Sequence, residues 1–130
     1  MSDINVSASF AKIADAQVER LMNEIAGVVA VVISTADGFE VAARARDASQ
    51  SSRLSAMASS IAAIGAVIGE ETLTGACKGI FIEADKGQIV MVEIRHPEHV
   101  LILTIVTDEQ GLLGAVTYSA RQTALMLAKA

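Results

Sequence analysis

The chain has few of the residues that covalent cross-links, cofactor pockets and catalysis require. Its 130 residues include one cysteine, one proline, one tyrosine, three phenylalanines and no tryptophan. A single cysteine, Cys77, excludes an intramolecular disulfide and is typical of a reducing cytosol. The N-terminal residues also lack the basic segment and apolar core of a signal peptide. A cytoplasmic protein without an aromatic cofactor pocket is therefore expected.

Charge is also scarce, and positive charge most of all. Charged residues make up 19% of the chain, against roughly 25% in typical domains, and the net charge is -5. No run of Lys or Arg forms a basic patch, so the electrostatic attraction that drives nucleic-acid binding is missing. An anionic membrane surface would not attract the chain either. The hydrophobic content of 52% predicts one well-packed domain over residues 1–130, with 1–7 flexible. A chain that is both small and this apolar is expected to form an oligomer.

The segment from Ser55 to Gly69 contains no charged residue at all. Its large apolar residues recur every three or four positions, which predicts a helix from Leu54 to Gly69. A soluble helix normally has a charged face opposite its apolar stripe, and this one has none. A second subunit would cover it, with the small residues marking where another backbone approaches; a fully buried central helix is the alternative. The segment is shorter than the ~20 residues of a membrane span, so no membrane insertion is expected.

The remaining pattern predicts an α+β fold in the order α-β-β-α-β-β-β-α. An amphipathic helix ends near Gly27, and Asp37-Gly38 marks a tight hairpin turn in which both residues need positive φ. Three closely spaced strands later in the chain permit only antiparallel neighbours. We expect one five-stranded antiparallel sheet with two helices on one face and one on the other. The predicted helices span 10–25, 54–69 and 116–129, and the predicted strands span 28–34, 39–44, 78–84, 88–95 and 100–107.

Candidates for chemistry are few. His96 and His99 form a His-x-x-His pair in a turn, with no third ligand nearby in sequence, and are interpreted as turn residues. Cys77 has no adjacent histidine to activate it. Two adjacent acidic pairs, at 70–71 and 108–109, are interpreted as solvated loop ends. The glycines form no phosphate-binding loop, although Gly111 and Gly114 precede the last helix, where an anion site is conceivable. The sequence predicts no catalytic residue, metal or cofactor, and hence no enzyme.

The order of elements and several short segments resemble the Roadblock family, the dynein-light-chain-roadblock type. The resemblance runs from about Phe10 to Lys129. It is carried by the hairpin of residues 31–42, the helix that begins Leu-Ser-Ala-Met-Ala at 54–58, the two strands around Gly87, and residues 103–114. It implies a homodimer or a heterodimer with a paralogue, in which the middle helix packs against its copy and two sheets join edge to edge. It also implies a non-enzymatic regulator or platform for a Ras-like small GTPase.

The expected dimer interface combines the helix of residues 54–69 with the strand of residues 78–84. An exposed apolar strand edge invites pairing, so we expect the strand to lie at a sheet edge and to join its copy. The predicted interface residues are Ser55, Ala58, Ser59, Ala62, Gly65, Ala66, Gly69, Ile80 and Ile82. The alternative function is a small-ligand sensor of the PAS or GAF type, which shares the element order but usually has several short helices around a pocket.

Overall fold

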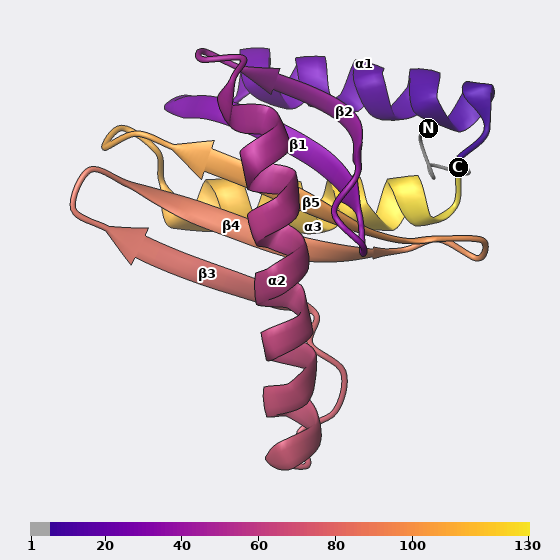
Figure 1. Ribbon diagram of the computed structural model, residues 1–130. Coiled ribbons are helices and arrows are strands. Elements are labelled where there is room, and N and C mark those ends of the chain that lie inside the picture. Colours follow the sequence, from indigo (N-terminus) through magenta and orange to yellow (C-terminus); the bar gives the residue numbers. More distant parts are fainter. Residues whose placement is uncertain (1–5) are drawn as a thin grey trace.

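The computed structural model describes residues 6–130, which form one antiparallel sheet flanked by helices (Figure 1). The part of the predicted flexible segment at residues 1–5 lies outside the described residues. The observed order confirms the predicted α-β-β-α-β-β-β-α arrangement. The elements are α1 (Ala8–Glu24), β1 (Val28–Thr35), β2 (Glu40–Ala45), α2 (Gln50–Glu71), β3 (Gly79–Ala84), β4 (Gly87–Arg95), β5 (Val100–Thr107) and α3 (Leu113–Ala128).

The five strands lie in the order β2-β1-β5-β4-β3, and every neighbouring pair is antiparallel. β5 lies in the middle, between β1 and β4, and the interior positions of β1 and β5 explain why their sequences are apolar on both faces. β2 and β3 form the two edges, as the half-polar pattern of residues 39–44 and the pairing expected of residues 78–84 predicted. The β3–β4 and β4–β5 connections are the short turns of a meander, whereas α2 carries the chain from one edge of the sheet to the other.

The first helix begins where a local cap is available. The Ser7 side-chain oxygen accepts a hydrogen bond from the backbone N–H of Phe10 at 3.1 Å, as expected of an N-cap residue. Val6 packs against the core just before this cap. After α1 ends at Glu24, Gly27 adopts a φ of +84°, which turns the chain into β1.

The first hairpin differs from the tight two-residue turn that Asp37-Gly38 predicted. Only Gly38, with a φ of +98°, has positive φ in this turn. The Thr35 N–H donates to the Phe39 carbonyl at 2.8 Å, so the loop includes Phe39 and β2 starts at Glu40. A register shift between Ile33 and Ser34 accompanies the longer loop. The physical reason is that one glycine supplies positive φ at one position, and the loop lengthens to use it there.

The two faces of the sheet carry cores of very different size. α1 and α3 pack on one face, where they enclose large side chains such as Leu21, Leu103, Ile105 and Leu127. α2 packs alone on the other face, over a small cluster of Ala58, Met91 and Ile102. The two-and-one arrangement of helices is as predicted. Most of the apolar surface that stabilises the fold therefore lies under α1 and α3, and the α2 face remains thinly covered.

Two helix boundaries differ from the predicted ones in a way that matters. α3 starts at Leu113, three residues earlier than expected. α2 has 22 residues, because polar residues at 50–53 and the two glutamates at 70–71 extend it. By length and composition alone α2 could therefore cross a membrane, with 17% of its most apolar window buried. The sequence-based argument that this segment is too short to cross a membrane was therefore wrong. Residues along one side of α2 nevertheless pack on the sheet.

Candidate functional site: an exposed apolar helix beside an open strand edge

The helix α2 lies across the strands, and its C-terminal half extends past β3 (Figure 1). Most of its contacts with the sheet are made to β1, β2 and β5. The side that faces the sheet carries small residues, with Ser55 and Ala58 only 1% and 2% exposed. The Ser59 hydroxyl donates to the Ala36 carbonyl at 2.6 Å and so joins the helix to the first hairpin. Small side chains allow α2 to lie close to the sheet.

Two glycines of α2 are required by the chain's own return segment. A side chain at Gly69 would collide with the Gly75 carbonyl, and a β-carbon at Gly65 would lie 2.8 Å from the Cys77 sulfur. The Gly69 carbonyl also accepts hydrogen bonds from the N–H groups of Thr74 and Gly75, at 3.0 and 3.2 Å. The close approach that these glycines permit is therefore used within one subunit.

The structure shows how far each predicted interface residue of α2 is buried within one subunit. Ser55, Ala58 and Gly69 are buried inside the subunit, so these residues offer almost no surface to a partner. Ala62 and Gly65 are half-buried on the same side. The reason is that the stripe of small residues fits the chain's own sheet and return loop. Of the predicted helix residues, Ala66 is exposed, while Ser59 is half-buried.

The outer side of α2 is apolar and open to solvent. Met57, Ile64, Val67 and Ile68 are between 52% and 60% exposed. Three of these, Met57, Ile64 and Ile68, belong to the large-residue stripe recognised in the sequence. Sequence reasoning did not place this stripe at the surface. Because contiguous exposed apolar residues mark interaction surfaces, the outer side of α2 is the leading candidate for one.

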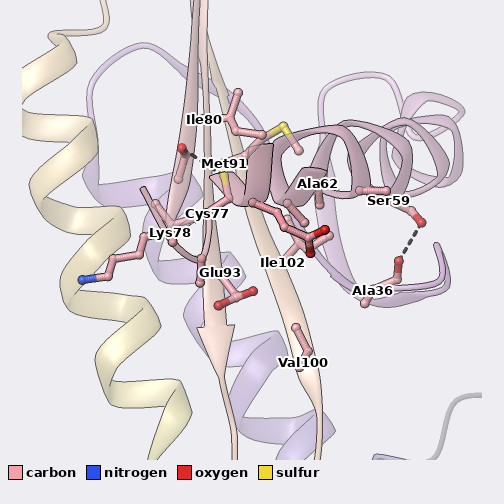
Figure 2. Close-up of a pocket in the computed structure, with 17 residues that line it drawn as sticks. Ala36, Ser59, Ala62, Cys77, Lys78, Ile80, Met91, Glu93, Val100 and Ile102 are labelled. Atoms are coloured by element: carbon pink, nitrogen blue, oxygen red, sulfur yellow. Dashed lines mark hydrogen bonds between the residues drawn. The ribbon is translucent and has the colours of Figure 1, made fainter. Parts of the chain in front are cut away.

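An apolar cleft of about 580 Å³ lies between α2 and the end of the sheet that carries β3, β4 and β5. Figure 2 shows Cys77, Ile80 and Met91 on one side of it and Ala62 and Ser59 on the other. Its charged lining residues are Glu70, Lys78 and Glu93. The Lys78 side chain points away from it toward α3 (Figure 2). The cleft exists because α2 covers only part of this face of the sheet.

The edge strand β3 borders this cleft. Ile80 is half-buried and lines the cleft, whereas Phe81 and Ile82 are 45% and 37% exposed. On the opposite face of the sheet, the guanidinium carbon of Arg121 lies 5.5 Å from the centre of the Phe81 ring. β3 thus presents apolar side chains on both faces together with an unpaired backbone edge.

The candidates for chemistry are scattered. The rings of His96 and His99 stack with centroids 5.7 Å apart, and the His96 Nε2 atom is 2.9 Å from the Ala130 carbonyl oxygen. Within residues 6–130, no three metal-binding side chains come together. The Asp108 carboxylate accepts from the Gln110 N–H at 2.9 Å and lies 3.7 Å from Arg46, which makes it a loop-stabilising residue. Gly111 packs against Thr107, and the cap position of α3 is Leu112, which makes no side-chain capping bond.

Among residues 6–130, two ionisable groups have clearly shifted pKa values, and neither lies in the cleft. A hydrogen bond to Asp15 raises the pKa of Arg44 and joins α1 to β2. Hydrogen bonds from the side chain and the N–H of Ser49 lower the pKa of the Asp47 carboxyl. Both groups therefore act in local structure.

A family model described as "Roadblock/LC7 domain" matches residues 14–107, most of the chain. The chain belongs to the Roadblock/LC7 family. No curated protein matches it at a significant level. The match confirms the family resemblance recognised in the sequence.

Solved structures share the fold of this Roadblock/LC7 domain. The gliding protein MglB from Thermus thermophilus superimposes with a TM-score of 0.84 at 16% identity, covering 99% of this chain and 96% of that one. Myxococcus xanthus MglB gives a TM-score of 0.81 at 16% identity, covering 97% and 92%. A Roadblock/LC7 domain from Streptomyces avermitilis gives 0.75 at 16% identity, covering 88% and 91%. At identities this low, the superpositions establish a common fold and nothing more.

Proposed function

We propose that this Roadblock/LC7 domain is a homodimer that acts as a non-enzymatic regulator or scaffold for a Ras-like small GTPase. The observation that supports a dimer is that the exposed apolar side of α2 lies beside the open β3 edge and the cleft. These three features are neighbours at one end of the molecule. A second copy would remove all three from water at once.

The backbone of β3 specifies how two copies would pair. The Glu93 N–H donates to the Lys78 carbonyl at 3.1 Å, so this pair is hydrogen-bonded. Hydrogen-bonded pairs alternate along an antiparallel ladder. The backbone groups that turn away from β4, toward the free edge, are therefore those of Gly79, Phe81 and Glu83.

A two-fold axis through Phe81 uses all of these free groups. Phe81 of one copy then faces Phe81 of the other, and Gly79 faces Glu83. An axis at Ile80 or Ile82 would leave one of the three residues on each copy without a partner inside the strand. Unpaired backbone groups are costly when covered, so the Phe81-centred register is the favoured one.

The same pairing accounts for the overhang of α2. A sheet that continues past β3 into the β3 and β4 of a second copy provides a surface under the C-terminal half of α2. The residues Ile64, Val67 and Ile68 would then pack over the second copy's cleft and against its α2. A typical specific interface buries about 1,200–2,000 Å² in total, which a helix and a strand from each subunit can supply.

The GTPase partner rests on the family resemblance. Solved relatives include a protein described as a gliding protein, MglB, and a form of MglB with a tetrameric arrangement. Regulation would require only that the dimer bind one nucleotide state more tightly than the other. A tenfold preference corresponds to about 1.4 kcal/mol, which a few contacts to a switch loop can provide. No side chain of the dimer would need to take part in hydrolysis.

The test is a pull-down from the native cytosol with the purified protein as bait. It is run once with the diphosphate and once with a non-hydrolysable triphosphate, and captured small GTPases are identified by mass spectrometry. We expect one GTPase, enriched in one nucleotide state. The purified pair is then assayed for nucleotide-dependent affinity, and equal affinity for both states would refute regulation while leaving a scaffold.

The cleft favours a second candidate function, a small-ligand sensor. Its volume of about 580 Å³ is within the range of small-molecule sites, and its lining is mainly apolar. Native mass spectrometry of protein purified from its own cytosol separates the two functions. A retained small molecule with no GTPase in the pull-down would favour the sensor.

A further inference from the structure

The helix α3 carries an exposed apolar surface that the proposed dimer does not use. Tyr118, Leu125 and Met126 are 67%, 60% and 39% exposed. They lie on the face of the sheet opposite α2, so a dimer built on α2 and the β3 edge would leave much of this surface open.

A groove of about 270 Å³ runs along this surface between α3 and β4. Its apolar lining comes from one residue of β4 and three of α3, and its charged lining from three basic residues and one acidic one. These are Val92, Ala124, Leu125 and Ala128, then Lys78, Arg95, Arg121 and Glu93. Glu93 forms an ion pair with Arg95, so the groove retains an excess of positive charge.

This positive groove contrasts with the rest of the molecule. The chain carries a net charge of -5, yet residues 110–130 contain Arg121 and Lys129 and no Asp or Glu. Among residues 6–130, Arg121 contacts no carboxylate within ion-pair distance, and the ring of Phe81 lies beneath its guanidinium group instead. A cation held over an aromatic ring keeps its N–H donors available for an anionic ligand.

We propose that this groove binds an acidic amphipathic peptide segment of a partner protein. The apolar side of the segment would pack on Leu125 and Ala124, and its carboxylates would pair with Arg121 and Lys78. An apolar floor with charged edges is the pattern by which grooves bind one face of a helical peptide. The concave shape favours a peptide over an anionic membrane. The binding requires neither the dimer nor the GTPase.

The probe is a synthetic helix-forming peptide of about 16 residues. It carries Leu on one face and Glu elsewhere, and it contains no Tyr or Trp. Tyr118 is the only tyrosine of the chain, which has no tryptophan, and it lies on the α3 surface, so its fluorescence reports binding. We expect a saturable change in emission that weakens as salt is added. The same peptide with Lys in place of Glu should not bind.

Substitutions on the protein locate the site. Arg121→Glu should weaken binding by at least about tenfold, because it places a negative charge where the carboxylates would pair. Lys12→Glu makes the same charge change on the exposed side of α1 and should leave affinity within about twofold. Ile64→Glu, on the α2 surface, should also leave it unchanged, which separates this site from the dimer. Circular dichroism and thermal melts verify that each variant is folded.

Equal losses in Arg121→Glu and Lys12→Glu would overturn the proposal, as would equal binding of the Glu and Lys peptides. Vesicles containing phosphatidylserine form a further arm. The wild-type protein could bind these vesicles but not the Glu peptide, and Arg121→Glu could abolish the vesicle binding. That result would assign the surface to a membrane and refute the peptide proposal.

Discussion

Replacing Ile64 with alanine should weaken the dimer while leaving the subunit folded. Ile64 is 60% exposed in the subunit, so its side chain contributes little to the core. Full burial of an isoleucine side chain is worth about 1.5–3 kcal/mol. The part of the Ile64 side chain that is exposed in the subunit would therefore contribute about 1–2 kcal/mol of binding free energy per copy, or about 2–4 kcal/mol per dimer, when the interface removes it from water.

This loss corresponds to a dimer dissociation constant raised about 30-fold to 1,000-fold. Ile64→Glu should do more, because a carboxylate buried without a partner costs several kcal/mol. Sedimentation equilibrium over a range of concentrations measures the dissociation constant and also distinguishes two copies from four. The matched control is Leu125→Ala, which removes an equally exposed side chain from α3.

The reasoning is refuted by any of three results. The wild-type protein could sediment as a single chain at tens of micromolar. Ile64→Ala could leave the dissociation constant within about threefold of the wild type. Leu125→Ala could weaken the dimer as much as Ile64→Ala does, which would place the interface on α3. A melting temperature far below that of the wild type at monomeric concentrations would show that Ile64 stabilises the subunit itself.

Three further predictions test the strand register, the core and the hydrogen bonds between Ser49 and Asp47 before α2. Phe81→Cys, with Cys77 replaced by serine, should form a disulfide between two copies, because the α-carbons of facing residues lie about 5.5 Å apart. Ile80→Cys in the same background should form none. A non-reducing gel that shows the reverse would place the two-fold axis at another residue. Leu21→Ala, at a fully buried position under the sheet, should lower the free energy of unfolding in urea by about 2–5 kcal/mol. Asp47 accepts hydrogen bonds from Ser49 that lower its pKa, so its contribution to stability is present above its ordinary pKa and is lost as the pH falls through the lowered value. Unfolding curves of Asp47→Asn should lack this part of the acid dependence, and curves parallel to those of the wild type would contradict it.

Much of the fold could be predicted because its signals are local. Alternating or continuous runs of β-branched residues, together with turn residues, located the five strands within one residue at each end. The half-polar pattern of residues 39–44 and the pairing expected of the apolar strand 78–84 predicted two edge strands, which are β2 and β3. The hairpin at Asp37-Gly38 was the exception, because its loop length depended on how β1 and β2 pair across a register shift.

The candidate helix was recognised in the sequence, but the sequence did not show which of its sides faces the sheet. A helical repeat shows which residues share one side of a helix. Because α2 has no charged side between Ser55 and Gly69, its sequence does not indicate which side faces the sheet. That choice depended on the loop of residues 74–77, which returns so close to Gly65 and Gly69 that only small residues fit there. The large residues at 57, 64 and 68 were consequently left at the surface.

By itself, the sequence determined the order of the elements, the single antiparallel sheet and the family, because each depends on short-range patterns and their spacing. The tertiary structure alone decided the orientation of α2 and the existence of the basic groove. Lys78, Arg95 and Arg121 are separated by 17 and more residues in the chain, and only the packing of α3 beside β4 brings them to one groove. Surfaces built from distant segments leave no pattern in any one of them.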